Sequence, residues 1–302
     1  MSNNKILVVG SANTDLVIHT EKMPKIGETL SGSNFAVNAG GKGLNQAVAI
    51  SKLGNDVSFL GAVGNDINGT MLVDTLKGYG IDFIGKRVDG VATGTAVITV
   101  VNGDNCIILD EGANGTVSPQ LAEENAEKIK NSDFVVLQLE IPLETVVKVC
   151  EIAKEGSTKV ILNPAPYKEL PKEIYSMVDY LIPNEHEAED ITGIELNCEE
   201  NCINAINKIR EYGVKNVIIT LGEKGSAYNI EEKTFFSPAV KCNVVDTTCA
   251  GDSFIGALLV KLSQNKPLDE AVKFASKVAS VTVSREGAAK SVPYIEEISE
   301  EE

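Results

Sequence analysis

Two aspartates lie on either side of a run of small residues in the stretch VVDTTCAGDSF, residues 244–254. Apolar residues with helical spacing follow, so Cys249, Ala250 and Gly251 are expected at the amino end of a helix. Unpaired N–H groups and the helix dipole bind anions at such an end, and small side chains allow close approach of the backbone. Asp252 could then take a proton from a hydroxyl group that attacks a phosphoryl group bound there.

Each aspartate also has a purely structural interpretation. Asp252 could simply favour the first turn of its helix, and Asp246 could make a turn hydrogen bond that needs no ligand. Spacing alone favours the structural interpretation of Asp252, because short motifs often match by chance. A second glycine-rich stretch, NAGGKGLNQA at residues 38–47, matches neither a Walker A loop nor GxGxxG. It could hold a phosphate, or it could pack a helix tightly against a sheet.

The elements that must position these residues predict an α/β fold. Short, continuous apolar runs are typical of strands buried on both faces of a parallel sheet. They are KILVVG, VSFLGAVG, DFVVLQLE, KVILNPAP, VDYLIPNE and KNVIITLG. Helical patterns such as SPQLAEENAEKIKN lie between them. Ligands collect at the carboxyl ends of such strands, where the chain places Asn13, Asp15, Glu140, Asn184, Glu187 and Thr220.

Two segments interrupt this alternation. ETLSGSNFAVN (28–38) and GTAVITVVNGDNCIILD (94–110) predict strands of a separate, smaller sheet, with a hairpin turn at Asn102-Gly103-Asp104. A small sheet inserted into an α/β body is typical of a lid. We therefore expect one domain over residues 1–302, with lid strands inserted at about 16–38 and 94–110.

Composition argues against several classes of function. A net charge of −16 disfavours nucleic acid as a partner. A membrane partner is not expected either, since no apolar run approaches the roughly 20 residues of a membrane span. MSNNKILVVGSANTD predicts a strand and a turn rather than a signal peptide, which favours a cytoplasmic location. The CEENC pair (198–202) lacks further metal ligands, so its cysteines are expected to be reduced thiols on a helix surface.

The two glycine-containing stretches together resemble the signatures of the ribokinase-like family of carbohydrate kinases. The early signature is GGKGLNQA (40–47) and the late one is DTTCAGDSFIGAL (246–258). The resemblance runs along essentially the whole chain and includes GSANTD, KIGETLSG, VLQLE, NPAP, PNEHEAE, TLGEKG and SREGAAKSVP. It implies a three-layer α/β sandwich with a central, mostly parallel sheet and a small inserted β-sheet lid.

The resemblance implies ATP-dependent phosphorylation of D-ribose at the 5-hydroxyl, giving D-ribose 5-phosphate and ADP. By this similarity Asp252 is the base, and the backbone N–H groups of Cys249, Ala250, Gly251 and Asp252 form an anion hole. The sugar would be bound by Asn13, Asp15, Gly41, Lys42, Gly43, Asn45, Glu140 and Asp252. ATP would contact Asn184, Glu187, Thr220, Gly222, Gly225, Gly251 and Ser276, with Glu187 linked to Mg²⁺.

The resemblance also implies a monovalent cation, usually K⁺, beside the anion hole. Its ligands would come from Asp246, Thr248, Thr282, Arg285, Gly287 and Ser291. A homodimer formed through the lid strands is implied as well. The chain departs from the family at Cys249, where alanine or glycine is usual. A thiol at a helix amino end is expected to have a lowered pKa, and we hypothesise that its alkylation would block phosphate entry.

Other functions remain open from the sequence. The substrate could be another furanose or a nucleoside, such as fructose, deoxyribose or adenosine, although 5% aromatic residues and no Trp weakly disfavour a wall for a base. A catalytically inactive sugar- or nucleotide-binding regulator is a second class, which the intact Asp252 and the Asn184/Glu187 pair disfavour. A dehydrogenase is disfavoured because GSANTD stands where GxGxxG would follow the first strand.

Overall fold

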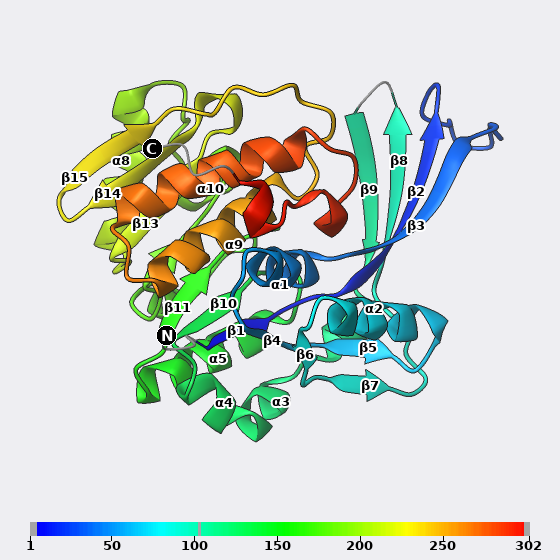
Figure 1. The fold of residues 1–302 in the computed structure, drawn as a ribbon, viewed down its shortest axis with the longest axis horizontal. Helices are drawn as coiled ribbons and strands as arrows, with labels where there is room; N and C mark the ends of the chain where they lie inside the picture. The colour runs from blue at the N-terminus through cyan, green and yellow to red at the C-terminus, as the bar shows by residue number, and fades with distance from the viewer. Residues whose placement is uncertain (1–4, 102–103, 299–302) are drawn as a thin grey trace.

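The computed structural model describes residues 5–101 and 104–298, and nine strands within these ranges form one sheet (Figure 1). Its order is β15 (Lys233–Ser237), β14 (Ser226–Ile230), β13 (Asn216–Thr220), β12 (Tyr180–Leu181), β11 (Lys159–Leu162), β10 (Phe134–Leu137), β1 (Ile6–Val9), β4 (Val57–Leu60) and β6 (Asp82–Phe83). Strands β13 to β6 in this order are parallel, while β14 and β15 add an antiparallel edge. The predicted, mostly parallel sheet is confirmed.

Helices cover both faces of this sheet. Ile6 and Val8 of β1 pack into one buried cluster, while Leu7 and Val9 pack into another on the opposite face. The first cluster includes residues of α1 (Lys42–Lys52), α2 (Ile67–Gly78), α9 (Ala250–Ser263) and α10 (Leu268–Val283). The second includes residues of α3 (Pro119–Glu124), α4 (Ala126–Lys130), α5 (Leu143–Glu155), α6 (Lys172–Tyr175), α7 (Glu185–Thr192) and α8 (Glu199–Glu211). Alternate residues of one strand thus serve two cores, which explains the continuous apolar runs.

Three local features differ from the sequence-based expectations. VSFLGAVG divides into β4 and β5 (Ala62–Gly64), and β5 pairs with β7 (Lys86–Val88) in a separate two-stranded sheet. The single helical pattern at 118–131 forms α3 and α4, because the Asn125 side chain donates to the Leu121 carbonyl at the break. Cys202 is buried in the core rather than on the surface of α8, whereas Cys198 is exposed.

The lid is a four-stranded sheet with the order β3 (Ser33–Gly40), β2 (Asn13–Thr20), β8 (Thr95–Val101) and β9 (Asp104–Asp110). Figure 1 shows it projecting from the body beyond α1. Both predicted segments contribute strands, but β2 begins at Asn13. Asn13 and Asp15 therefore lie within the first lid strand and not in a loop after β1. β8 and β9 pair antiparallel from Val101↔Asp104, whereas residues 102 and 103 of the predicted turn lie outside the described residues.

One face of the lid exposes a row of apolar side chains. Strand register places Val37, Leu16, Val97 and Ile108 side by side across β3, β2, β8 and β9. Ile108 is 74% exposed, and Val37 and Val97 are also exposed. The lid thus resembles a sheet with one uncovered face, whereas the central strands of the body sheet are buried on both faces.

Short 3-10 helices lie at Gly112–Thr116, Gly222–Lys224, Ala289–Ser291 and Ile295–Glu297. Among the described residues, every helix is too short or too polar to cross a membrane.

Candidate active site

The amino end of α9 presents backbone to open space. The helix begins at Ala250, and the preceding Cys249 adopts a left-handed conformation with φ of 69°. A Cβ atom added to Gly251 would meet no heavy atom within 4 Å, so space for a ligand lies in front of this turn. The helix end that the sequence predicted is therefore present. Its Ala250 N–H donates to the Thr247 carbonyl at 3.2 Å, whereas among the described residues the N–H groups of Cys249, Gly251 and Asp252 have no partner and can bind an anion.

A cavity of about 420 Å³ lies at this helix end. The predicted site residues that line it are Lys42, Asn184, Glu187, Thr220, Gly222, Cys249, Ala250, Gly251 and Asp252. Gly225 and Ser276 do not line it, and neither do the predicted sugar contacts Asn13, Asp15, Gly41, Gly43, Asn45 and Glu140. Gly225 has φ of 96° beside the Ser237 backbone, which explains the glycine structurally. Ser276 lies on α10 and is half-buried.

Asp252 occupies the first turn of α9, where two amide side chains from α1 hold it. Asn45 Nδ2 donates to its Oδ2 at 3.1 Å, and Gln46 Nε2 donates to its Oδ1 at 2.9 Å. Burial raises the pKa of Asp252, although Lys42 and the two amides oppose the rise. A carboxylate whose pKa lies above its ordinary range accepts protons more readily near neutral pH, as a general base requires.

Three carboxylates converge around the Lys42 ammonium group. Burial and the charges of Glu140 and Asp252 raise the pKa of Asp15 to about 7. Burial alone would lower the pKa of Lys42, but Asp252, Glu140 and Glu187 raise it. Lys42 therefore remains charged, and it partly balances the negative charges that the fold brings together here.

Two buried polar groups lack the partners that a closed protein interior would supply. Within residues 5–101 and 104–298, no group donates a hydrogen bond to the Asp15 carboxylate, and Asn45 Oδ1 is buried with no partner. Buried polar groups are normally satisfied, and these two residues lie next to Asp252, so their oxygens are free to accept hydrogen bonds from a ligand bound there. Both are acceptors, which suits a compound that carries several hydroxyl groups.

The GGKG segment packs helix α1 against the β1–β2 connection. A Cβ atom on Gly43 would lie 2.7 Å from the Ser11 nitrogen, and Gly41 has φ of 89°. Glu140 joins the same junction, because it accepts hydrogen bonds from Ser11 Oγ and from the Lys42 backbone N–H. The packing interpretation of these glycines is confirmed, and this packing brings Lys42 to the cavity and Asn45 to Asp252.

Asn184 and Glu187 form a capping box at the start of α7. Asn184 Oδ1 accepts from the Glu187 N–H at 2.9 Å, and Glu187 Oε2 accepts from the Asn184 N–H at 2.8 Å. Burial raises the pKa of Glu187 despite the Asn184 hydrogen bond and the charge of Lys42. The pair therefore has a structural role as well as a position on the cavity wall.

Asp246 joins two loops beside the amino end of α9. Its Oδ1 accepts from the Thr248 N–H at 2.9 Å, and its Oδ2 accepts from the Gly287 N–H at 3.0 Å. Burial would raise the pKa of Asp246, but these hydrogen bonds and the charge of Lys290 lower it. An ionised carboxylate at this junction is consistent with a cation site and also with the predicted turn hydrogen bond.

Two of the remaining predicted cation ligands, Thr282 and Ser291, have internal hydrogen bonds. The Thr282 carbonyl accepts from the Arg285 N–H at 3.1 Å, and Ser291 Oγ donates to the Ala288 carbonyl at 2.8 Å. A carbonyl and a hydroxyl oxygen each retain a lone pair in these bonds, so both can also coordinate a cation. The donor set of one carboxylate, carbonyls and a hydroxyl suits a hard cation of low charge.

The predicted low pKa of Cys249 is wrong. Burial raises the pKa of its thiol well above the ordinary value, and the nearby Asp252 charge adds to this effect. The residue packs in a small buried cluster with Ala49, Ala288 and Val292. Desolvation by these apolar neighbours outweighs the effect of the helix end.

Sequence reasoning missed three amide residues next to the site. Gln46 donates to Asp252, Gln138 Nε2 donates to Gln46 Oε1 at 2.6 Å, and Asn163 Oδ1 accepts from Gln46 Nε2 at 3.3 Å. Each lies inside a motif that the sequence analysis quoted: GGKGLNQA, VLQLE and NPAP. A long polar side chain within an apolar stretch was the available signal, and all three side chains are buried.

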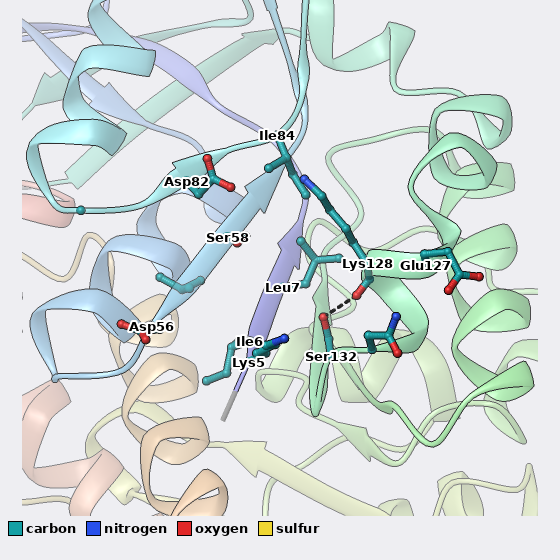
Figure 2. Close-up of a pocket in the computed structure, with 13 residues that line it drawn as sticks. Lys5, Ile6, Leu7, Asp56, Ser58, Asp82, Ile84, Glu127, Lys128 and Ser132 are labelled. Carbon is teal, nitrogen blue, oxygen red and sulfur yellow. Dashed lines mark hydrogen bonds between the residues drawn. The ribbon is translucent and has the colours of Figure 1, made fainter. Parts of the chain in front are cut away.

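A second cavity, of about 540 Å³, lies at the amino ends of β1, β4 and β6 (Figure 2). Lys5, Asp56 and Asp82 contribute to its lining, and Figure 2 shows the Lys128 side chain reaching across it toward Ile84. None of the predicted site residues lines this cavity. Ligands of open α/β sheets bind at the carboxyl ends of the strands, so the first cavity is the candidate site.

The fold and the site together define a class of protein, a three-layer α/β enzyme with a lid sheet and a buried carboxylate beside an anion-binding helix end. The model of the pfkB family carbohydrate kinases matches residues 3–295. The chain belongs to this family.

Individual relatives cover the chain along almost its whole length. The ribokinase of Staphylococcus aureus (strain COL) is 37% identical over 302 residues, which is 98% of this chain and 99% of that protein. The deoxyribokinase of Salmonella typhi is also 37% identical, covering 98% of this chain and 97% of that protein. The structure of Arabidopsis thaliana ribokinase complexed with ribose and ATP has a TM-score of 0.92 and 35% identity, covering 98% of this chain and 97% of that chain.

Proposed function

We propose that this protein transfers the γ-phosphoryl group of ATP to the 5-hydroxyl of D-ribose. The observation that carries the proposal is the Asp252 carboxylate, which is buried at the open amino end of α9 beside the unpartnered acceptors Asp15 and Asn45. The similarity to ribokinases supports the choice of sugar, and the structure with ribose and ATP bound supports both substrates. ATP as co-substrate also supports a cytoplasmic location.

At phosphorus the reaction forms one bond and breaks one, and a proton is transferred as well. The 5-hydroxyl oxygen attacks the γ-phosphorus, the bond from that phosphorus to the bridging oxygen of ADP breaks, and the hydroxyl proton moves to Asp252. The N–H groups of Cys249, Gly251 and Asp252 stabilise the charge that develops on the phosphoryl oxygens, and the Ala250 N–H joins them once it leaves the Thr247 carbonyl. Asp15, with no donor of its own, accepts hydrogen bonds from vicinal hydroxyls of the sugar. Glu140 and Lys42, which are joined by a hydrogen bond from the Lys42 N–H to Glu140, are the further residues proposed to contact the sugar.

ATP occupies the part of the cavity formed by α7, β13 and the start of α9. Thr220 and Gly222 line this part, together with Asn184 and Glu187. Mg²⁺ bound to the ATP phosphates supplies positive charge that offsets the charge of the reacting groups. Glu187 fits this ion because it is a carboxylate on the cavity wall whose two oxygens each accept one hydrogen bond from Asn184 and keep further lone pairs, and it would hold the ion through water. Gly225 and Ser276 stay predicted ATP contacts from family similarity.

The carboxylate of Asp246 is the part of the structure that fits a monovalent cation, and K⁺ is the ion proposed. Its lowered pKa keeps a negative charge between the Thr248 and Gly287 loops. The cation would be held by Asp246 with the oxygens of Thr248, Thr282, Arg285, Gly287 and Ser291. It would fix the loop that carries the anion hole and would not touch substrate.

A homodimer through the lid is also part of the proposal. The exposed row of Val37, Val97 and Ile108 gives an apolar face that a second copy can cover. Replacing Ile108 with Glu is expected to convert a dimer into a monomer in sedimentation experiments. Ile67→Glu, at an exposed position on α2, is the matched control and should leave the dimer intact. A monomeric wild type would contradict this part of the proposal.

The first experiment measures ADP release from Mg-ATP with D-ribose, 2-deoxyribose, fructose and adenosine, each in K⁺ and in Na⁺. The highest kcat/KM is expected for ribose in K⁺. A higher value for 2-deoxyribose would favour the second candidate, which the deoxyribokinase relative supports. Folded protein that binds ATP but turns over none of these acceptors would favour the binding-regulator interpretation.

A further inference from the structure

The amide group of Gln46 lies between the carboxylate of Asp252 and the amide group of Gln138. Gln46 Nε2 donates to Asp252 Oδ1 at 2.9 Å, and Gln138 Nε2 donates to Gln46 Oε1 at 2.6 Å. Both glutamines have 0% exposure. They come from α1 and from the end of β10, so the contact joins two elements to the start of α9.

Gln138 determines which end of the Gln46 amide faces Asp252. Rotating that amide by half a turn would bring its oxygen against the Asp252 oxygen and its NH₂ group against the NH₂ group of Gln138. Both contacts would be repulsive, because each would pair two acceptors or two donors. Asn163 Oδ1 favours the same orientation, since it accepts from Gln46 Nε2 at 3.3 Å.

This arrangement leaves one buried oxygen atom, Gln138 Oε1, without a hydrogen-bond partner among the described residues. A Cβ atom on Gly10 would overlap this oxygen. An unsatisfied buried oxygen costs stability and is rare in folded proteins. An apolar residue of similar size at 138 would avoid this cost, so a requirement beyond packing accounts for the glutamine.

We propose that Gln46, oriented by Gln138, is a positioning residue for the Asp252 carboxylate. Gln46 holds Asp252 Oδ1 and stabilises the ionised form, and Asn45 holds Oδ2. Neutral donors fix the carboxylate without neutralising it, so it keeps a free lone pair for the proton of the sugar hydroxyl. The role rests on the function proposed above, because it assigns Asp252 as the base.

The groups with charge or titratable protons around Asp252 come from every element packed against it. They are Lys42 on α1, Asp15 on β2, Glu140 after β10, Glu187 on α7 and Cys249 before α9. Lys42 favours the ionised form of Asp252, whereas Asp15, Glu140 and Glu187 disfavour it. Gln46, like Lys42, stabilises the ionised form of Asp252, so removing the Gln46 amide is expected to raise the pKa of Asp252.

The test is the pH dependence of turnover in Gln46→Met, which removes the amide and keeps the length of the side chain. Loss of a hydrogen bond to a charged group is expected to lower kcat about 10- to 100-fold and to raise the acidic pKa of the kcat profile by about one to two units. The KM for ribose should change much less. Gln120→Met, on the exposed surface of α3, is the matched control and should leave the profile unchanged.

Gln138→Met supplies a second variant and a double-mutant cycle. Because Gln138 acts through Gln46, the double variant is expected to be no slower than Gln46→Met alone, whereas independent packing defects would multiply. The proposal would be overturned if the kcat losses of the two single variants multiplied in the double variant. It would also be overturned if the acidic pKa of the kcat profile were unchanged in a folded Gln46→Met protein.

A measurement that needs no turnover can test the positioning role of Gln46 separately from the proposed kinase function. The pKa of Asp252 also follows from the pH dependence of the unfolding free energy of each protein relative to its Asp252→Asn partner. Gln46→Met should raise that pKa even if no tested sugar is phosphorylated. A wild type without turnover would refute the proposed function, while an unchanged Asp252 pKa in Gln46→Met would refute the positioning role.

Discussion

Asp246 and Asp252 lie close together in one loop-and-helix segment, yet their carboxyl groups have opposite environments. Asp246 is half-buried and accepts backbone N–H groups from Thr248 and Gly287, and its pKa is lowered. Asp252 is buried, its partners within residues 5–101 and 104–298 are two side-chain amides, and its pKa is raised. Backbone donors with partial hydration stabilise a permanent anion, whereas deep burial with neutral donors leaves a carboxylate that can take up a proton.

The comparison shows why one motif needs both aspartates. Asp246 fixes the loop around the anion hole through hydrogen bonds to two segments of backbone, so its charge serves structure. Asp252 has side-chain partners that hold its orientation, and in the proposed reaction its carboxylate accepts the hydroxyl proton. A carboxylate with the surroundings of Asp246 would be a weaker proton acceptor, and one with the surroundings of Asp252 would not join the Thr248 and Gly287 loops. Each prediction below removes or tests one part of this difference.

The largest effect is expected from Asp252→Asn. Asparagine keeps the shape of the side chain but cannot accept the hydroxyl proton, so kcat should fall about 10²- to 10⁴-fold, the usual contribution of a general base. The affinity for ATP should change only a few-fold, because Asn184, Thr220 and Gly222 line the part of the cavity proposed for ATP. The KM for ribose should also change only a few-fold, because Asp15 and Glu140 are proposed to hold the other hydroxyl groups of the sugar. Steady-state kinetics and ATP titration measure both quantities. A variant with a kcat near that of the wild type would remove Asp252 as the base.

Asp15 is a third carboxylate to set beside Asp246 and Asp252, because it is buried and accepts no hydrogen bond from the described residues. Its pKa is raised from 3.8 to about 7 in the folded protein, so ionisation opposes folding increasingly as the pH rises between these values. Asp15→Asn should therefore raise the unfolding free energy little near pH 4 and most above about pH 7. The gain above that pH is about 4 kcal/mol at most, since each unit of pKa shift corresponds to about 1.4 kcal/mol.

Chemical denaturation of the ligand-free protein across this pH range measures the effect. Asp74→Asn, at an exposed position on α2, is the matched control and should show no such trend. A gain for Asp15→Asn that is equal at all pH values would mean that packing, not charge, accounts for it. The same variant should bind ribose weakly, because an asparagine offers one acceptor oxygen where the carboxylate offers two.

Much of the fold follows from the sequence because each central strand is buried on two faces. Continuous apolar runs such as that of β10 are typical of such strands. Element boundaries were less predictable where side chains act locally. Asn125 divides one helical pattern into two helices, and the pairing of β2 with β3 and β8 extends the lid strand back to Asn13.

The hydrogen-bond network and the ionisation states of the site could not be predicted from local sequence. Asp252 lies far along the chain from Gln46 and Gln138, and only tertiary packing brings the three together. The predicted pKa of Cys249 was wrong for the same reason. Its thiol is desolvated by Ala49 and Val292, which are distant in the sequence but packed against it in the fold. Spacing within a motif identifies residue types, whereas burial and partners determine what those residues do.

A smaller effect than that of Asp252→Asn is expected from Asp246→Asn. Asparagine keeps an acceptor for the Thr248 N–H but loses the acceptor for the Gly287 N–H and the negative charge. Losing a charge-assisted hydrogen bond outside the reacting groups is expected to lower kcat about tenfold. Turnover should also become insensitive to replacing Na⁺ with K⁺, because the proposed cation loses its carboxylate ligand. A K⁺ stimulation equal to that of the wild type would place the cation elsewhere.

The smallest effect is expected at Cys249, which lies between the two aspartates. Its thiol is buried and its pKa is raised, so the reactive thiolate is scarce near neutral pH. An alkylating reagent should therefore modify the exposed Cys198 readily and leave Cys249 unmodified until the protein is unfolded, with activity retained. Peptide mass spectrometry alongside an activity assay measures both. Fast labelling of Cys249 with loss of turnover would mean that the segment between Asp246 and Asp252 opens in solution, and the different burial of the two carboxylates would then be transient.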